Sequence, residues 1–200
     1  MKLLPTAKNL KLALFCTAAI SASIVVPSTL SLVPGLNVAT AHAEQEQKTK
    51  RVPALREKVY SQLARAQKLA DDGDVKGGLE ALDSIQERAS SMNSYEIAMM
   101  HNFYGFIYYN ENDLPKAIAS FEKVVAEEAI PESLRLSTTF SLAQLAMANG
   151  EYKKVIAFLD KWDEINTKPI TEGYYLLRAQ TYYQLKEYPK GLEYINQVIA

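Results

Sequence analysis

Residues 95–131, YEIAMMHNFYGFIYYNENDLPKAIASFEKVVAEEAIP, contain the clearest pattern in the sequence. A polar turn at residues 110–113 separates two segments in which apolar and aromatic side chains recur at helical spacing. These side chains are Ile97, Met100, Tyr104, Ile107 and Tyr108, followed by Ala117, Phe121, Val124 and Val125. Asp113 can cap the second helix, and Pro115 fits its first turn, where a missing N–H costs nothing. The stretch therefore predicts one helical hairpin.

Small residues determine how closely the two predicted helices can approach each other. Gly105 lets the second helix come close to the first, and Ala117 offers the matching small surface. Tyr108 and Phe121 fill the flanks of this contact. We expect the equivalent packing positions in the other repeats to be Ala66, Gly78, Ala143, Val155, Ala179 and Gly191.

Weaker copies of the hairpin precede and follow residues 95–131. We predict hairpins at about 54–92, 94–130, 131–167 and 169–200, which together make one helical repeat domain spanning 54–200. Matching the small or branched residues that begin the second helices gives repeat steps of 39, 38 and 36 residues, counted over Gly78, Ala117, Val155 and Gly191.

The repeat resembles the tetratricopeptide repeat (TPR), whose usual period is about 34 residues. The family signature appears here as His101, Tyr104-Gly105, Tyr108, Ala117, Phe121 and Pro131. His101 and Tyr104 replace the usual Trp and Leu, and Pro131 falls two residues late. The resemblance implies an all-α fold, a right-handed superhelix of about four hairpins. The segment before these hairpins has its own pattern, that of an N-terminal signal peptide.

In this family the first helix of each hairpin lines a concave groove that holds an extended peptide or a partner helix. The resemblance therefore implies a protein-binding groove made of Leu63, Gln67, Asn102, Phe106, Tyr109, Phe140, Gln144, Leu176, Gln180 and Tyr183. Side-chain amides can pair with a peptide backbone, and aromatic rings supply contact area at low entropic cost. The alternative is that several of these rings belong to the core. A clamp for a terminal carboxylate in this groove is not expected, because Leu63, Asn102 and Phe140 occupy the places of its cationic residues.

The first 43 residues have the pattern of a cleaved secretory signal peptide. A basic segment ends at Lys11, an apolar stretch covers 12–26, and Ala41 and Ala43 are the small residues that a signal peptidase reads. A cut after Ala41 and an uncleaved anchor remain alternatives. Residues 44–53 are polar and predict a flexible leader. The only cysteine, Cys16, lies within the signal, so the mature chain needs no disulfide, and a bacterial periplasm is the expected compartment.

Composition gives no indication of an enzyme. After the signal, His101 is the only histidine and cysteine is absent, so paired-histidine metal sites and cysteine nucleophiles lack their parts. We predict no catalytic residue, no metal and no cofactor, and we interpret His101 as a packed side chain. The formal net charge of −1 does not single out nucleic acid as a partner, and no membrane contact is expected after signal cleavage.

A narrower similarity involves the runs at 93–96, 101–109, 143–145 and 180–185. They are similar to exported TPR proteins that accompany TonB, ExbB and ExbD energy-transducing systems in marine gammaproteobacteria. This similarity implies a periplasmic accessory of TonB-dependent uptake. The alternatives are an envelope-assembly scaffold, acting on outer-membrane proteins or peptidoglycan enzymes, and the targeting module of a longer enzyme.

Overall fold

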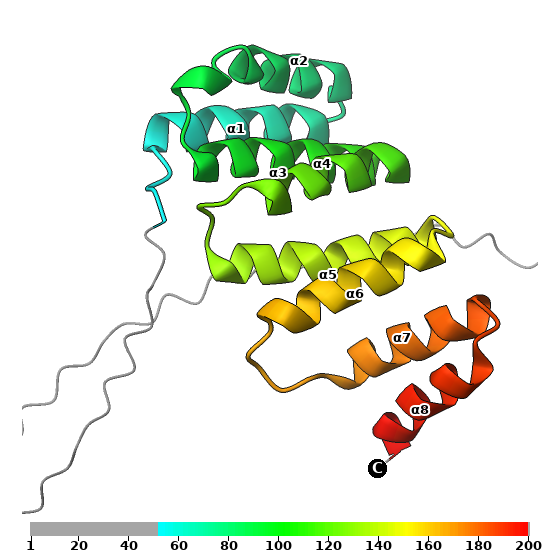
Figure 1. Ribbon diagram of the computed structural model, residues 1–200. Helices are drawn as coiled ribbons and strands as arrows, with labels where there is room; N and C mark the ends of the chain where they lie inside the picture. Colours follow the sequence, from blue (N-terminus) through cyan, green and yellow to red (C-terminus); the bar gives the residue numbers. More distant parts are fainter. Residues whose placement is uncertain (1–51, 200) are drawn as a thin grey trace, which may run out of the picture. The chain divides into compact units, whose positions relative to one another are not determined.

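The structure, a computed structural model, describes residues 52–199 (Figure 1). The predicted signal peptide at 1–43, its residues Ala41 and Ala43, and the leader up to residue 51 lie outside the described residues. Within the described part there are only helices: α1 (Glu57–Asp71), α2 (Val75–Gln86), the 3-10 helix η1 (Ala89–Ser91), α3 (Ser94–Asn110), α4 (Leu114–Ala126), α5 (Glu132–Ala148), α6 (Tyr152–Ile165), α7 (Glu172–Gln184) and α8 (Tyr188–Ile199).

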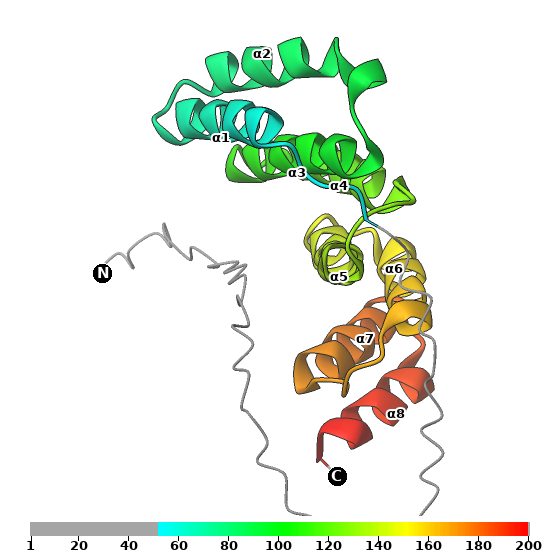
Figure 2. The ribbon, with the colours of Figure 1, turned by 90° about the vertical axis from the view of Figure 1, so that its left-hand side faces the viewer.

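Consecutive helices pair into four hairpins, α1 with α2, α3 with α4, α5 with α6 and α7 with α8. Further contacts join α1 and α2 to α3, α4 to α5, and α6 to α7. Figure 2 shows α5 and α7 on one side of this helical unit and α6 and α8 on the other. The expected all-α array of about four hairpins is thus confirmed for residues 52–199.

The four hairpin turns share one backbone geometry. Each contains one residue in the left-handed region, namely Gly73 (φ 97°), Asn112 (φ 60°), Gly150 (φ 75°) and Lys186 (φ 62°). The amide that follows each of these residues donates to a carbonyl five residues earlier, as Asp113 N does to Tyr108 O at 2.8 Å. Such bonds satisfy carbonyl groups at the end of the first helix. The same turn therefore recurs at the same place in every hairpin.

Acidic residues follow these turns and stabilise the start of the second helices. The Asp113 carboxylate accepts a hydrogen bond from the Lys116 amide, and Pro115 lies in the first turn of α4, as the sequence predicts. Lys116 also pairs with Asp113 through its ammonium group at 2.7 Å. The equivalent ion pairs at i and i+3 recur in the next two hairpins, between Glu151 and Lys154 and between Glu187 and Lys190.

The small residues lie where the two helices of a hairpin meet. A Cβ atom placed on Gly78 would come within 2.8 Å of Ala66 O, and one on Gly105 would come within 2.6 Å of the Phe121 ring. The other positions named from the sequence are also buried except for Tyr108, which is half-buried; these are Ala66, Ala117, Phe121, Ala143, Val155, Ala179 and Gly191. Close approach of the two helices in the first two hairpins therefore depends on glycine at these positions.

Candidate protein-binding face

The candidate interaction surface, the first-helix face, lies on the first helices of the hairpins. It comprises Asn102, Phe106, Tyr109, Phe140, Gln144, Leu176, Gln180 and Tyr183, which belong to α3, α5 and α7. Their exposure differs strongly from one helix to the next.

The α1 part of the predicted groove is not available for binding. Leu63 is 0% exposed and packs in a cluster with Ala66 and Ile107, so its prediction as a groove residue is wrong. The reason is that α1 contacts both α2 and α3, and this side chain fills the space between the helices. Gln67 is half-buried, and its amide nitrogen donates to Asp71 of the same helix at 2.8 Å.

The rings on α3 and α5 contribute to both the core and the surface. Phe106 is half-buried and meets the edge of Phe121 at 5.5 Å between ring centroids. Phe140 is half-buried and lies 5.8 Å from Trp162, measured in the same way. Tyr109 packs against the same core, and Asn102 is half-buried. These positions expose only part of each side chain.

The α7 part carries the accessible apolar groups. Leu176 is 41% exposed and Tyr183 is 64% exposed, while Gln180 on the same helix and Gln144 on α5 are exposed as well. The Tyr183 ring lies 5.5 Å from the ring of Tyr188, which belongs to α8 and is 50% exposed. Aromatic groups supply contact area at low entropic cost, and amides can pair with a peptide backbone. This part of the face therefore has the composition of a protein-binding surface.

A charge cluster around one buried arginine fixes α7 against α6. Arg178 is 3% exposed and donates from Nη2 to Asp160 at 2.7 Å and to Asp163 at 2.6 Å. Its Nε donates to the Tyr174 hydroxyl, which in turn donates to Asp163 at 2.6 Å. The guanidinium also lies over the rings of Tyr174 and Tyr194. α7 is therefore held to α6 and α8 by polar as well as apolar contacts.

Burial disfavours the cation of Arg178, but hydrogen bonding to Asp160 and the surrounding oxygen atoms hold its pKa above the usual value. The sequence analysis missed this cluster. Two signals were present: Asp160 and Asp163 are three residues apart and therefore share a helix face, and Arg178 directly precedes the packing residue Ala179.

His101 is a half-buried side chain on α3, 6.2 Å from the Tyr104 ring. Burial, together with the nearby positive charge of Lys123, lowers its pKa to about 4, so the imidazole is neutral at physiological pH.

Residues 52–199 contain no group of three or more His, Cys, Asp or Glu side chains arranged to hold a metal ion. None of the helices in this range combines the length and the apolar character that a bilayer span requires.

Comparisons with known proteins agree with this architecture. A family model described as anaphase-promoting complex, cyclosome, subunit 3 matches residues 110–198. Two crystal structures of TPR-like repeats from Podosopora anserina, described as those of a kinesin light chain, are similar at TM-scores of 0.53 and 0.52. Each is 19% identical and covers 71% of this chain, and the match spans 73% and 74% of those chains. No curated protein matches the sequence.

The described helices thus form a TPR-type helical repeat fold, as the sequence signature predicts. Folds of this type generally act as scaffolds that bind other proteins, and they do so through their extended surfaces. The class of protein that the fold defines is therefore a TPR-like helical repeat protein.

Proposed function

We propose that this chain is a non-catalytic scaffold that binds another protein through the first-helix face and works in the bacterial periplasm as an accessory of TonB-dependent transport. The observation that carries the binding role is the exposure of Leu176 and Tyr183 on α7, beside the exposed amides of Gln144 and Gln180. A partner that covers these groups would remove apolar surface from water and meet amide groups that can pair with its backbone.

The repeat architecture supports this role, because it presents side chains from several helices along one continuous surface. The matched family is described as a subunit of a complex, which supports a place within a multiprotein assembly. The periplasmic location is supported by the basic start, the apolar stretch at 12–26 and the small residues Ala41 and Ala43.

Site-specific photo-cross-linking in native cells tests the binding role. A benzophenone amino acid at Tyr183 is expected to capture a discrete partner, to be identified by mass spectrometry. The same group at Lys153, an exposed residue of α6, is the matched control and should give little of that product. Leu176→Ser with Gln180→Ala should lower the yield at Tyr183 while the circular dichroism spectrum stays unchanged.

The identity of the captured protein tests the general scaffold role and the specific transport pathway separately. A TonB-system component supports the transport role, whereas another envelope protein retains the scaffold and rejects that pathway. Equal capture at Tyr183 and Lys153 contradicts the assignment of the face. Cell fractionation, together with the mass of the mature N-terminus, tests export and cleavage after Ala43.

A further inference from the structure

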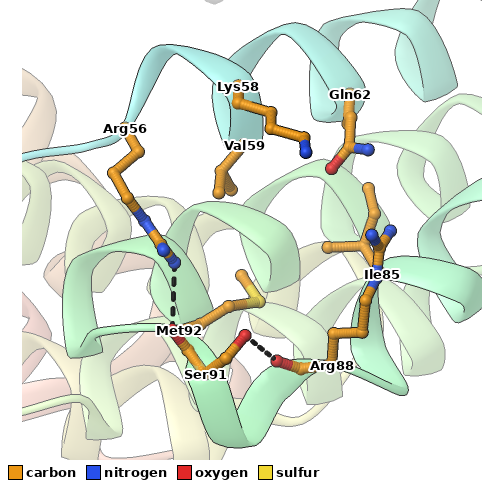
Figure 3. A pocket seen from close by; sticks show the side chains of 8 residues that line it. All are labelled: Arg56, Lys58, Val59, Gln62, Ile85, Arg88, Ser91 and Met92. Carbon is orange, nitrogen blue, oxygen red and sulfur yellow. Dashed lines mark hydrogen bonds between the residues drawn. The ribbon is translucent and has the colours of Figure 1, made fainter.

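A small pocket lies in the first hairpin between α1, the end of α2 and η1, and it shares no residue with the first-helix face (Figure 3). Its apolar floor consists of Val59, Ile85 and Met92, of which Ile85 is 5% exposed. The volume is about 160 Å³. Pockets for cofactors and drug-sized ligands usually hold ~300–1,000 Å³, and a cavity of ~150 Å³ accepts a single benzene. The pocket is therefore sized for one side chain.

Three cationic side chains surround this floor, but one of them is already neutralised. Arg56 donates from Nε and Nη2 to the two carboxylate oxygens of Glu96, at 2.6 Å each, and Nη2 also donates to Ser91 O at 3.0 Å. Glu96 is 0% exposed, so this pair is a structural link between the start of α1 and the start of α3. Arg56 forms a fixed wall of the pocket and supplies no net charge.

Lys58 and Arg88 are the two cations that remain. Both are exposed, no acidic side chain lines the pocket, and neither forms an ion pair within residues 52–199. Figure 3 shows the head groups of Lys58, Gln62 and Arg88 pointing toward the same part of the pocket. Two like charges and an amide donor beside an apolar floor favour a ligand that carries an anionic group next to an apolar group.

We propose that this pocket binds the C-terminal residue of a partner polypeptide, with its α-carboxylate between Lys58 and Arg88 and its aliphatic side chain on Val59, Ile85 and Met92. The proposal rests on the proposed scaffold function and adds a second, chemically defined contact to it. In a C-terminal residue the carboxylate and the side chain share one Cα atom, so both demands of the pocket are met within its volume. An internal Asp or Glu brings the anion without a separate apolar group.

Fluorescence polarisation with short peptides tests the proposal directly. The probe is fluorescein-Gly-Ser-Gly-Ser-Ala-Leu with a free carboxylate, compared with the same peptide amidated at its C-terminus. Removing the charge should weaken binding by about tenfold or more, because a charged hydrogen-bonding group loses its partners. Replacing the terminal Leu by Gly should also weaken binding by roughly tenfold, because the floor then stays uncovered.

Variants connect the effect to the pocket. Lys58→Gln with Arg88→Gln should weaken the free-acid probe by about tenfold or more and should abolish the difference between acid and amide. Lys153→Gln with Lys161→Gln removes the same charge from exposed positions on α6 and should leave both affinities unchanged. All four substituted residues are exposed, so the variants should fold like the parent chain. Circular dichroism of each variant checks this.

Several results would overturn the pocket assignment. They are equal affinities of the acid and the amide for the unaltered chain, equal binding of an amidated probe with an internal Asp, and no saturable binding of the acid probe up to ~1 mM. Cross-linking at Tyr183 reports on the scaffold function independently. If the partner is still captured at Tyr183 while these peptides fail, the C-terminal pocket is rejected and the scaffold function stands.

Discussion

The ring of Phe121 occupies the space that a Cβ atom on Gly105 would need, with ring carbons only 2.6 Å from that position. We expect Gly105→Ala to destabilise the protein by about 1–3 kcal/mol, because the ring must move within a filled core. The gain in helix propensity from Gly to Ala, about 1 kcal/mol, does not offset this clash. Urea denaturation measures the change.

Gly173 offers a matched control for this substitution. A Cβ atom there would meet only Thr171 Oγ1, at 4.0 Å, so Gly173→Ala should be neutral or slightly stabilising. Phe121→Leu in the Gly105→Ala background should recover part of the loss. A Gly105→Ala protein as stable as the parent chain would show that α3 and α4 can separate at no cost.

In the ion cluster around Arg178, we expect loss of the two aspartates to destabilise the protein more than loss of the arginine. The Arg178 side chain is 4% exposed, whereas those of Asp160 and Asp163 are 58% and 40% exposed. Replacing both aspartates by Asn leaves a buried cation without a carboxylate and should cost about 3–5 kcal/mol. Arg178→Met leaves two carboxylates that water can reach and should cost under about 1.5 kcal/mol. Urea unfolding of both variants checks the order, and the reverse order would contradict it.

Glu96 predicts a loss of stability in acid. Hydrogen bonding from the Arg56 side chain lowers the pKa of Glu96 to about 2, from an ordinary value of 4.5. The native state therefore binds fewer protons than the unfolded chain between these values, and stability falls as the pH drops from 4.5 toward 2. Glu96→Gln should be less stable at neutral pH and should show a flatter slope in this window. The measurement is the urea midpoint as a function of pH.

The lowered pKa of His101 should make the stability of the fold depend on pH in a second, higher range. Its pKa is lowered to about 4, mainly by burial, whereas the unfolded imidazole titrates near 6.5. The unfolded chain binds the additional proton between these values, so stability declines as the pH falls from 6.5 to 4. His101→Phe should flatten the slope in this range and leave the acidic window of Glu96 intact. NMR titration of the imidazole gives the pKa itself, and a value near 6.5 would contradict the argument.

The turn between α7 and α8 predicts a stabilising substitution. Lys186 adopts φ 62°, a region that costs a residue with a Cβ atom about 1–2 kcal/mol and costs glycine nothing. Lys186→Gly should therefore raise stability by about 0.5–1 kcal/mol after the larger backbone entropy of glycine is subtracted. Lys190→Gly, within α8, is the control and should destabilise. Thermal unfolding distinguishes the two.

Periodicity was sufficient to predict the fold, because apolar side chains recur at helical spacing and the hairpin turns repeat. Gly73, Asn112 and Gly150 are residues that tolerate the left-handed region, and Asp113 with Pro115 marks a helix start, so local signals agreed with the final structure. Lys186 carries no such signal, and only the repeat pattern predicts a hairpin over this part of the chain.

The site was harder to predict, because a residue's position in the repeat does not determine whether its side chain is accessible in the folded chain. Leu63 occupies a groove position in the signature but is 0% exposed, since α1 packs against α3 as well as α2. The pocket between α1 and α2 joins Lys58 with Arg88, which are 30 residues apart in the sequence and belong to no motif. Only the hairpin geometry brings them together.

In the described unit, the main contacts of each helix are with helices one or two places away along the chain. Such an arrangement has no long crossing connection that fixes the number of hairpins. A whole hairpin could be duplicated or deleted during evolution with repair needed only at the two adjoining surfaces. The length of the binding surface, and with it the size of the partner, can therefore change in units of one repeat.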